Sequence, residues 1–287
     1  MKKNFLNISG KIESNILAAI EKIANLANSE DIPFFLVGAM ARDLIFAKGH
    51  NIRPYRATLD IDIGVRVPDW IQYSKLKEGL VRTGEFKEDK EFQRLIFQNR
   101  LKVDLIPFGP IADIFGKVRW PYDDEIVMHI AGFEEAFVNS QILRLRDDPI
   151  LEIKAVTLAG LAVMKIISWN DRYPNRKKDA IDLAIIMRHY TAAGNLERIY
   201  NEHSDLLDLE NFDYFDAGVR LLGRDIAKIL TSEIKDRVLE ILAKETRKQE
   251  KSNLVVDMYT SNIFIEADFN RLLGLLEELK RGILERI

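Results

Sequence analysis

Three aspartates on two predicted strands carry the clearest chemical signal in this sequence. Asp60 and Asp62 are separated by one residue, and Asp104 lies in a second strand-like stretch, 101–108. Because side chains alternate between the faces of a strand, Asp60 and Asp62 share one face, roughly 7 Å apart along the strand. If the two strands are neighbours, the three carboxylates converge. Unpaired, they would repel one another, and the pKa of one would rise toward neutrality.

A divalent cation would remove that repulsion. Mg²⁺ is bound by a few carboxylate oxygens together with water and phosphate oxygens. Two such ions can hold the attacking and the leaving oxygens of a phosphoryl-transfer reaction. An isolated Asp-x-Asp is more often a solvated strand face. A metal site formed by Asp60, Asp62 and Asp104 therefore needs support from the surrounding residues.

A strand, a glycine and a helix precede the aspartates. The buried strand 33–37 leads into Val37-Gly38-Ala39-Met40-Ala41-Arg42-Asp43. A glycine at such a junction lets the backbone approach a phosphate, and the helix that follows offers unpaired amide donors. A simple tight turn is the alternative. The sequence has no Walker-A pattern and no Rossmann glycine fingerprint, which argues against ATPases and dehydrogenases.

The elements that must position these residues form two regions. Periodicity predicts three helices in the first region, at 12–28, 40–47 and 68–80. It also predicts strands at 33–37, 58–65, 93–98, 101–108, 126–130 and 150–156. From Thr157 onward the pattern is helical, with helices at 157–169 and 177–190. The predicted fold class is α+β: a mixed sheet flanked by helices over 1–155, then an α-helical domain over 156–287.

Charged residues stand out on the first two helices of the second region. Lys165 lies in a helix that is apolar nearly all round, and a lysine buried there without a partner costs several kcal/mol. We therefore expect it to reach an anion or a carboxylate, unless it snorkels to the surface. Asp179 and Asp182 share a face of the next helix. The basic residues 176–178 oppose its macrodipole, which is compatible with a facing anion, and a solvated charge run is the alternative.

The composition excludes several classes of protein. The 287 residues hold 42 Lys and Arg, 45 Asp and Glu, and no cysteine. Disordered chains, disulfide scaffolds, thiol nucleophiles and cysteine-bound zinc are thereby excluded. The net charge of -3 argues against a broadly basic nucleic-acid coat. The four histidines lack ligand spacing, and no serine-hydrolase elbow occurs. No apolar run approaches the ~20 residues of a membrane span, which predicts a cytoplasmic protein with no membrane partner.

The motifs, taken in order, resemble those of the DNA polymerase β-type nucleotidyltransferase superfamily. These motifs are Val37-Gly38-Ala39-Met40-Ala41-Arg42-Asp43, Arg56-Ala57-Thr58-Leu59-Asp60-Ile61-Asp62 and Val103-Asp104-Leu105. The first is similar to the glycine motif of CCA-adding enzymes. The second is closer to the AbiEii family of nucleotidyltransferase-type toxins. Lys165, Arg172 and Lys178-Asp179-x-x-Asp182-Leu183 look like that family's C-terminal motifs. Two features depart from the pattern: Ala39 replaces a glycine or serine, and the gap from Gly38 to Asp60 is long.

The resemblance implies an enzyme that moves a nucleoside monophosphate from an NTP to an acceptor hydroxyl and releases pyrophosphate. It implies two Mg²⁺ ions on Asp60, Asp62 and Asp104. It also implies Lys165 as the cation that neutralises the β and γ phosphates, with Asp179 and Asp182 orienting Lys165 and the neighbouring basic residues. The helical domain would select the acceptor. The residues that it implies on the nucleotide side are Gly38, Ala39, Arg42, Arg56, Lys178, Asp179 and Asp182.

The acceptor is open at this point. The resemblance favours RNA, tRNA included, held by a local basic patch. The residues that could supply this patch are Arg53, Arg56, Arg172, Arg176, Lys177 and Lys178. A protein hydroxyl or a small molecule such as an aminoglycoside is the alternative acceptor. A catalytically degenerate nucleotide-binding or interaction module is the alternative to an enzyme. The resemblance also implies a toxin with a cognate antitoxin.

Overall fold

The computed structural model describes residues 5–53, 58–121, 123–208, 213–247, 251–259, 263 and 268–285, without the side chains of 123–126. Arg56, which we predict on the nucleotide side, lies outside these residues. The chain divides into two compact units, Met1–Thr157 and Leu158–Ile287. The domain boundary predicted from the sequence falls between residues 155 and 156. Each unit is described below by itself.

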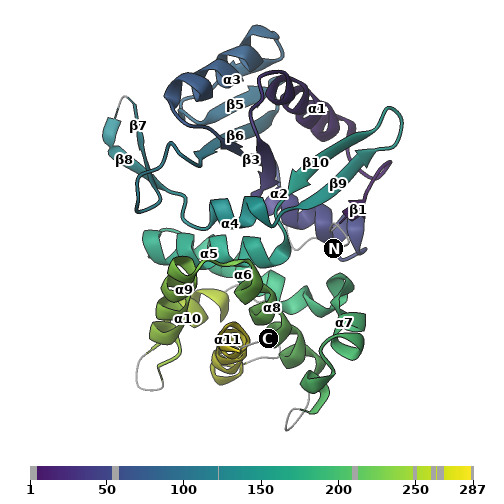
Figure 1. The fold of residues 1–287 in the computed structure, drawn as a ribbon, viewed down its shortest axis with the longest axis vertical. Coiled ribbons are helices and arrows are strands. Elements are labelled where there is room, and N and C mark those ends of the chain that lie inside the picture. The colour runs from purple at the N-terminus through teal and green to yellow at the C-terminus, as the bar shows by residue number, and fades with distance from the viewer. Residues whose placement is uncertain are drawn as a thin grey trace. The chain divides into compact units, whose positions relative to one another are not determined.

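An eight-stranded mixed sheet forms the first unit (Figure 1). Its strands lie side by side in the order β1 (Phe5–Asn7), β9 (Gln141–Arg146), β10 (Leu151–Ala155), β2 (Phe34–Val37), β3 (Asp60–Arg66), β6 (Leu101–Phe108), β5 (Arg94–Phe97) and β4 (Phe86–Glu88). β3 and β6 are parallel, and both have an antiparallel strand on their outer side, β2 and β5. β7 (Lys117–Trp120) and β8 (Asp123–His129) pair separately.

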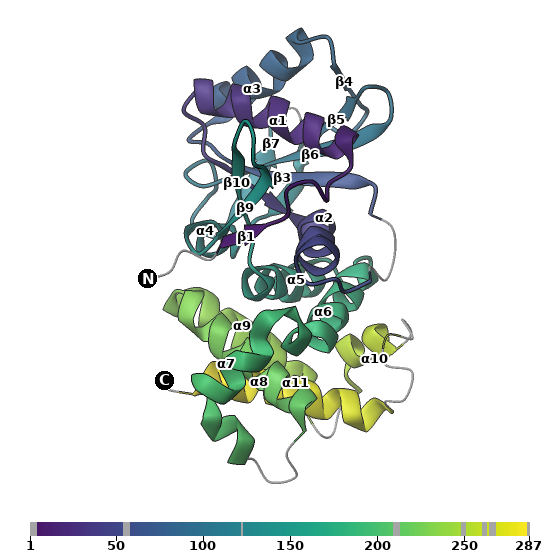
Figure 2. The same ribbon diagram turned by 90° about the vertical axis from the view of Figure 1, so that its right-hand side faces the viewer.

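The central strand β3 alternates between an apolar and an acidic face. Ile61, Ile63 and Val65 are fully buried, whereas Asp60 and Asp62 are half-buried on the opposite face. Helices α1 (Ser14–Ser29) and α3 (Trp70–Arg82) lie side by side on one side of the sheet (Figures 1 and 2). The hydroxyl of Tyr73 in α3 donates a hydrogen bond of 3.0 Å to the carbonyl oxygen of Leu105 in β6. Helices α1 and α3 thus cover the apolar face of the sheet.

Aromatic rings cover one end of the acidic face. Phe35 and Phe108 of the sheet pack edge-on to each other, with ring centroids 5.3 Å apart. Both also contact Phe133 and Phe137 of the short helix α4 (Phe133–Val138). Gly64 leaves room for this cluster, since a Cβ there would lie 2.4 Å from the Phe35 ring. The aspartates lie at the other end of the same face.

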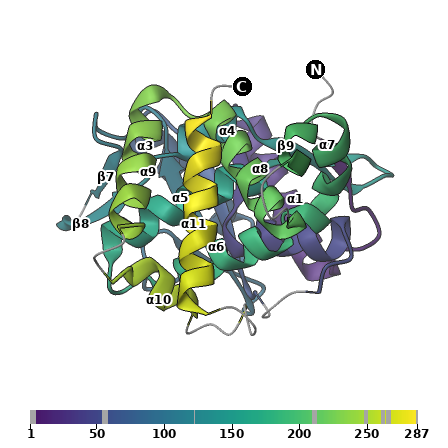
Figure 3. The same ribbon diagram turned by 90° about the horizontal axis from the view of Figure 1, so that it is seen from below.

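The second unit consists of helices (Figure 3). Its α-helices are α5 (Leu158–Arg172), α6 (Lys177–His189), α7 (Leu196–Asn201), α8 (Tyr214–Ile229), α9 (Ser232–Glu245), α10 (Asn253–Tyr259) and α11 (Phe269–Leu284). α8 and α11 cross at small residues. A Cβ on Gly282 would lie 2.1 Å from the carbonyl oxygen of Arg220. No helix in the described part of the chain combines the length and apolar character needed to cross a bilayer.

The α+β fold class predicted from the sequence is confirmed, and the element bounds differ in places. β6 coincides with the predicted strand 101–108, and α1 begins and ends within two residues of its prediction. The predicted helix 40–47 is instead α2 (Gly38–Asp43), followed by a π-helical turn, Leu44–Gly49. The short elements β1, β4, β7, α4 and β9 were not predicted, because three to six residues carry too little periodicity.

Candidate functional site

The sheet register brings the three aspartates together. β3 and β6 are parallel neighbours, and Asp62 lies directly opposite Asp104, while Asp60 lies opposite Lys102. Adjacent strands lie about 4.8 Å apart, so residues in register share one face at close range. The expectation that the two acidic strands are neighbours is confirmed. The first unit thus presents three carboxylates and a lysine on one face.

Gly38 lies directly against this acidic face. Its φ is +72°, and a Cβ built on it would lie 1.9 Å from Oδ2 of Asp62. The preceding residue, Val37, pairs with Asp62 across β2 and β3. Only a residue without a side chain can bring the backbone this close to the carboxylate. The glycine motif and the Asp-x-Asp pair are therefore parts of one site.

This arrangement predicts a large effect of Gly38→Ala. The new methyl group would displace the Asp62 side chain and occupy a backbone conformation that alanine disfavours. We expect nucleotide transfer to fall about a hundredfold, which corresponds to roughly 2.7 kcal/mol of transition-state stabilisation. Gly84→Ala is the matched control, because Gly84 has a φ of +77° but nothing within 4 Å of its Cβ position. Equal loss of transfer in both variants would show that backbone strain alone is responsible.

Arg94 is a site residue that we did not predict from the sequence. It lies opposite Asp104 across β5 and β6. Its Nε and Nη2 donate to the two oxygens of Asp104 at 2.7 and 2.8 Å. These hydrogen bonds raise the pKa of Arg94 above its ordinary value, so the guanidinium stays charged. No cluster of three or more His, Cys, Asp or Glu in the described residues is arranged to hold a metal ion. The third carboxylate is turned toward a guanidinium.

The donor set nevertheless fits Mg²⁺ in kind. Asp60 and Asp62 are half-buried carboxylates on one strand face, and Asp104 is in register beside them. Hard oxygen ligands that leave room for water and phosphate oxygens are what Mg²⁺ prefers. Asp104 can join such a site only by leaving or sharing its guanidinium partner. The types of residue present therefore fit Mg²⁺, although Asp104 is paired with Arg94 in this structure.

Arg42 differs from the expectation that it contacts a triphosphate. Its side chain is fully buried, and Nε and Nη2 donate to Oδ1 of Asp43 at 2.8 and 2.7 Å. The hydroxyl of Thr58, two residues before Asp60, donates to the other oxygen of Asp43. Arg42 thus orients Asp43, which joins the helix after the glycine to the start of β3. In this arrangement its guanidinium is not open to a ligand.

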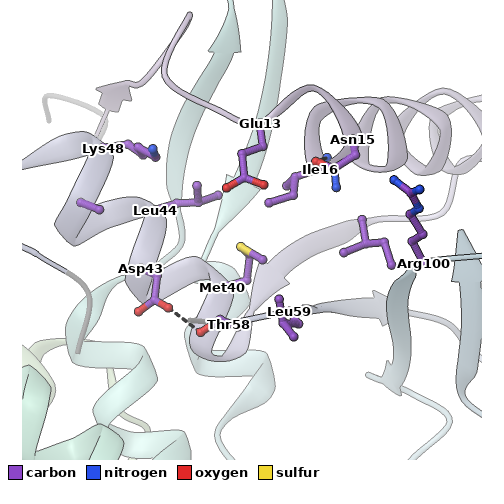
Figure 4. Close-up of a pocket in the computed structure, with 12 residues that line it drawn as sticks. Glu13, Asn15, Ile16, Met40, Asp43, Leu44, Lys48, Thr58, Leu59 and Arg100 are labelled. Atoms are coloured by element: carbon purple, nitrogen blue, oxygen red, sulfur yellow. Dashed lines mark hydrogen bonds between the residues drawn. The ribbon is translucent and has the colours of Figure 1, made fainter. Parts of the chain in front are cut away.

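A pocket of about 530 Å³ has Asp43 in its lining (Figure 4). Met40, Leu44 and Leu59 contribute apolar surface to its lining, and Lys48 and Arg100 contribute charge. Leu59 alternates with Asp60 along the chain, so the two side chains point to opposite faces. The pocket therefore lies on the other side of the sheet from the carboxylates.

In the second unit, Lys165 is held by two buried carboxylates. Its Nζ donates to Oδ1 of Asp179 at 2.9 Å and lies 2.7 Å from Oδ2 of Asp182. The side chain of Lys165 is 12% exposed, and those of Asp179 and Asp182 are 0% and 1% exposed. Ser168 and Arg176 donate to the same Asp179 carboxylate at 2.9 and 2.7 Å. The expectation that Lys165 reaches a carboxylate is confirmed.

The charges in this cluster fix one another's protonation. Burial alone would lower the pKa of Lys165, but the charges of Asp182 and Asp179 raise it. Burial alone would raise the pKa of Asp179, but Lys165 and Arg176 lower it to about 2. Asp179 and Asp182 are buried and both contact Lys165. Lys178 and Arg172 are exposed. The buried aspartates are thus placed to orient Lys165 and not to contact a nucleotide themselves.

The lowered pKa of Asp179 predicts acid sensitivity of the second unit. The ordinary value is 3.8, so this carboxylate stabilises the folded state above about pH 4 and loses that contribution as the pH falls toward 2. Its share of the unfolding free energy is on the order of 2 kcal/mol. Urea unfolding at several acidic pH values measures it. Asp179→Asn should flatten the pH dependence, and Asp236→Asn at an exposed position of α9 should leave it unchanged.

The fold and site of the first unit define a class of protein. A mixed sheet carries an Asp-x-Asp pair beside a strand–glycine–helix turn, with a further aspartate on the neighbouring strand; this is the arrangement of a nucleotidyltransferase. The family model described as "Nucleotidyl transferase AbiEii toxin, Type IV TA system" matches residues 24–252. The chain belongs to this family of nucleotidyltransferases. Comparison with the curated proteins gave no match.

Comparison with solved structures gave matches of low identity, three of which are the following. One is ANT(2")-Ia in complex with adenylyl-2"-tobramycin, 12% identical over 67% of this chain and 97% of that chain, with a TM-score of 0.39. Another is a CCA-adding enzyme with ATP, 15% identical over 96% and 68%, with a TM-score of 0.33. The third is the Thermotoga maritima CCA-adding enzyme with tRNA, 12% identical over 96% and 82%, with a TM-score of 0.28.

Proposed function

We propose that this nucleotidyltransferase moves a nucleoside monophosphate from an NTP to a hydroxyl group of RNA, tRNA included, and that it requires Mg²⁺. The observation that carries the proposal is the acidic face of the first unit. Three aspartates share it, and the Gly38 backbone lies against one of them. A site built only for stability would have little use for three neighbouring carboxylates, because their charges repel.

The residues of the first unit take distinct parts in this proposal. Asp60 and Asp62 would hold two Mg²⁺ ions, and Asp104 would complete the site on the acceptor side. When bound, such ions lower the pKa of the attacking hydroxyl and neutralise charge on the departing pyrophosphate. The backbone amides of Gly38 and Ala39, both half-exposed, would donate to oxygens of the triphosphate. Arg42 would act indirectly, by orienting Asp43.

The second unit would contribute a cation and the selection of the acceptor. Lys165 is our candidate for neutralising the β and γ phosphates. Asp179 and Asp182 would position it, as their contacts to its Nζ suggest. Lys178 is exposed and is a candidate for nucleotide or acceptor phosphate. Arg56 is a further candidate on the nucleotide side.

RNA is the acceptor that the family membership and the exposed charges favour. The family is described as the toxin of a toxin–antitoxin system. Arg53, Arg172, Lys177 and Lys178 are exposed and can contact phosphates. Arg176 contributes less to such a patch, because it is bonded to Asp179. We further propose a cognate antitoxin and a cytoplasmic location, where NTPs and tRNA are present.

The position of the transferred label tests the reaction. The enzyme is incubated with Mg²⁺, total RNA and NTPs that carry the label in either the α or the γ phosphate. We expect the α label, not the γ label, to enter RNA, and binding to tRNA to weaken steeply with salt. Transfer of the γ label would indicate a kinase. Label found only in protein or in a small molecule would contradict the proposed acceptor. Label in no fraction would favour a degenerate binding module.

A further inference from the structure

One ion pair in the first unit lies inside the proposed metal site. The guanidinium of Arg94 donates to both oxygens of Asp104, the carboxylate in register with Asp62. The side chains of Arg94 and Asp104 are 21% and 14% exposed. The charge of Asp60 also acts on Arg94. Arg94 thus pairs with one acidic residue of the site and feels the charge of another, so it is not an isolated surface residue.

The fold holds Arg94 in this position. The hairpin between β5 and β6 pairs Phe97 with Leu101, which leaves 98–100 as a three-residue loop. Gln98 and Asn99 adopt positive φ values of 46° and 59° there. This register sets Arg94 opposite Asp104, and residues directly opposite in an antiparallel pair share a face. The pairing of guanidinium and carboxylate is therefore built into the sheet.

The charges explain what this pairing does before any ion binds. Three carboxylates on one face would repel, and Arg94 offsets one of the three negative charges. Because an arginine side chain stays protonated in proteins, the pair can open only when Asp104 changes partner. A doubly charged ion attracts the carboxylates more strongly than a guanidinium does. Asp104 can then change partner without a change in the backbone.

We propose that Arg94 is a positioning residue that holds Asp104 in the metal-free enzyme and competes with the divalent ion for this carboxylate. This inference rests on the proposed function, because it takes Asp104 as a metal ligand. It adds a regulatory element to the site: the acceptor-side ion is bound only at the expense of the Arg94–Asp104 pair. Without a bound ion, Asp104 would thus stay paired with Arg94 and keep its orientation toward the site.

Binding of Mn²⁺ in the absence of nucleotide tests this competition. We would titrate the full chain with Mn²⁺ and follow the free ion by electron paramagnetic resonance. Arg94→Gln should bind Mn²⁺ at least about tenfold more tightly than the wild type, since the ion no longer competes with a guanidinium for Asp104. Arg94→Lys keeps the charge but loses the two-pronged contact, so its affinity should lie between the two. Arg144→Gln is the matched control, because Arg144 also pairs with a carboxylate, Glu152, on a neighbouring strand of the same sheet.

A second pair of variants shows whether the effect passes through Asp104. In an Asp104→Asn background, Arg94→Gln should no longer tighten Mn²⁺ binding, because the residue it competes for is gone. Unchanged or weaker Mn²⁺ affinity in Arg94→Gln would overturn the inference, as would the same gain in the Asp104→Asn background. Far-UV circular dichroism confirms that each variant is folded. Loss of transfer in Asp60→Asn/Asp62→Asn with no effect of Arg94→Gln on Mn²⁺ would leave the proposed function intact and refute this inference alone.

Discussion

The double substitution Asp60→Asn/Asp62→Asn is expected to lower Mg²⁺-dependent nucleotide transfer at least about a thousandfold. This corresponds to a loss of roughly 4 kcal/mol of transition-state stabilisation. Both carboxylates lie on one face of β3, and Gly38 packs against one of them. Asn keeps the size of each side chain but removes the charge that binds a divalent ion. The rate of α-label incorporation into RNA measures the effect.

The same double variant should fold as well as the wild type or better. Removal of two neighbouring negative charges relieves repulsion, so the free energy of unfolding should not decrease. Asp89→Asn is the matched control, because Asp89 is exposed, lies just after β4 in the same sheet and should tolerate the change. Transfer that persists in the Asp60→Asn/Asp62→Asn variant would refute the assignment of this face as the catalytic site.

Replacing Lys165 with Met should destabilise the second unit by about 3 kcal/mol or more. Asp179 and Asp182 are 0% and 1% exposed and would lose the ammonium that both contact. Arg176 would still pair with Asp179, whereas Asp182 would lose the ammonium that lies 2.7 Å from its Oδ2. Urea unfolding followed by far-UV circular dichroism measures the loss. Lys244→Met, at an exposed position of α9, should have little effect.

This destabilisation complicates any test of Lys165 in catalysis, and a second substitution resolves it. In Lys165→Met/Asp182→Asn one of the two buried carboxylates that contact Lys165 is neutralised as well, so stability should return at least in part. Nucleotide transfer should remain absent if Lys165 neutralises the phosphates. Recovery of both stability and transfer would assign Lys165 a purely structural role. Lys165→Met as stable as the wild type would contradict the buried cluster itself.

The residues of the acidic face of β3 were predictable because each belongs to a local pattern. The alternation from Asp60 to Val65 fixes which side chains share a face, and the structure shows that pattern unchanged. The run around Gly38 predicts a strand, a turn and a helix. Lys165 was expected to find a carboxylate because it lies on an apolar helix, and it contacts Asp179 and Asp182.

The role of Arg94 was missed because it depends on one residue of register. A two-residue turn at Asn99-Arg100 would pair Arg94 with Leu105 and turn it to the opposite face of the sheet. The observed three-residue loop pairs it with Asp104 instead. A shift of one residue moves every side chain of a strand to its other face. The three-residue loop depends on the positive φ values of Gln98 and Asn99. These values cannot be predicted from the local sequence alone.

The contacts of Arg42 were not predictable for a related reason. A basic residue just after a glycine motif is a natural phosphate ligand, but its burial depends on neighbours distant in sequence. Thr58 and Arg42 meet at Asp43, fifteen residues before Thr58. The sequence contains both partners but nothing that sets them side by side. Burial and long-range pairing, not residue type alone, decide whether a charged side chain is open to a ligand.

Mn²⁺ binding in the presence of a non-hydrolysable NTP analogue tests the central claim most directly. The claim is that Asp60, Asp62 and Asp104 together hold the divalent ions that the reaction needs. The wild-type chain should bind two Mn²⁺ ions with the analogue, and Asp60→Asn/Asp62→Asn should bind neither at the same concentrations. Equal binding of Mn²⁺ by the wild type and by that variant would contradict the claim.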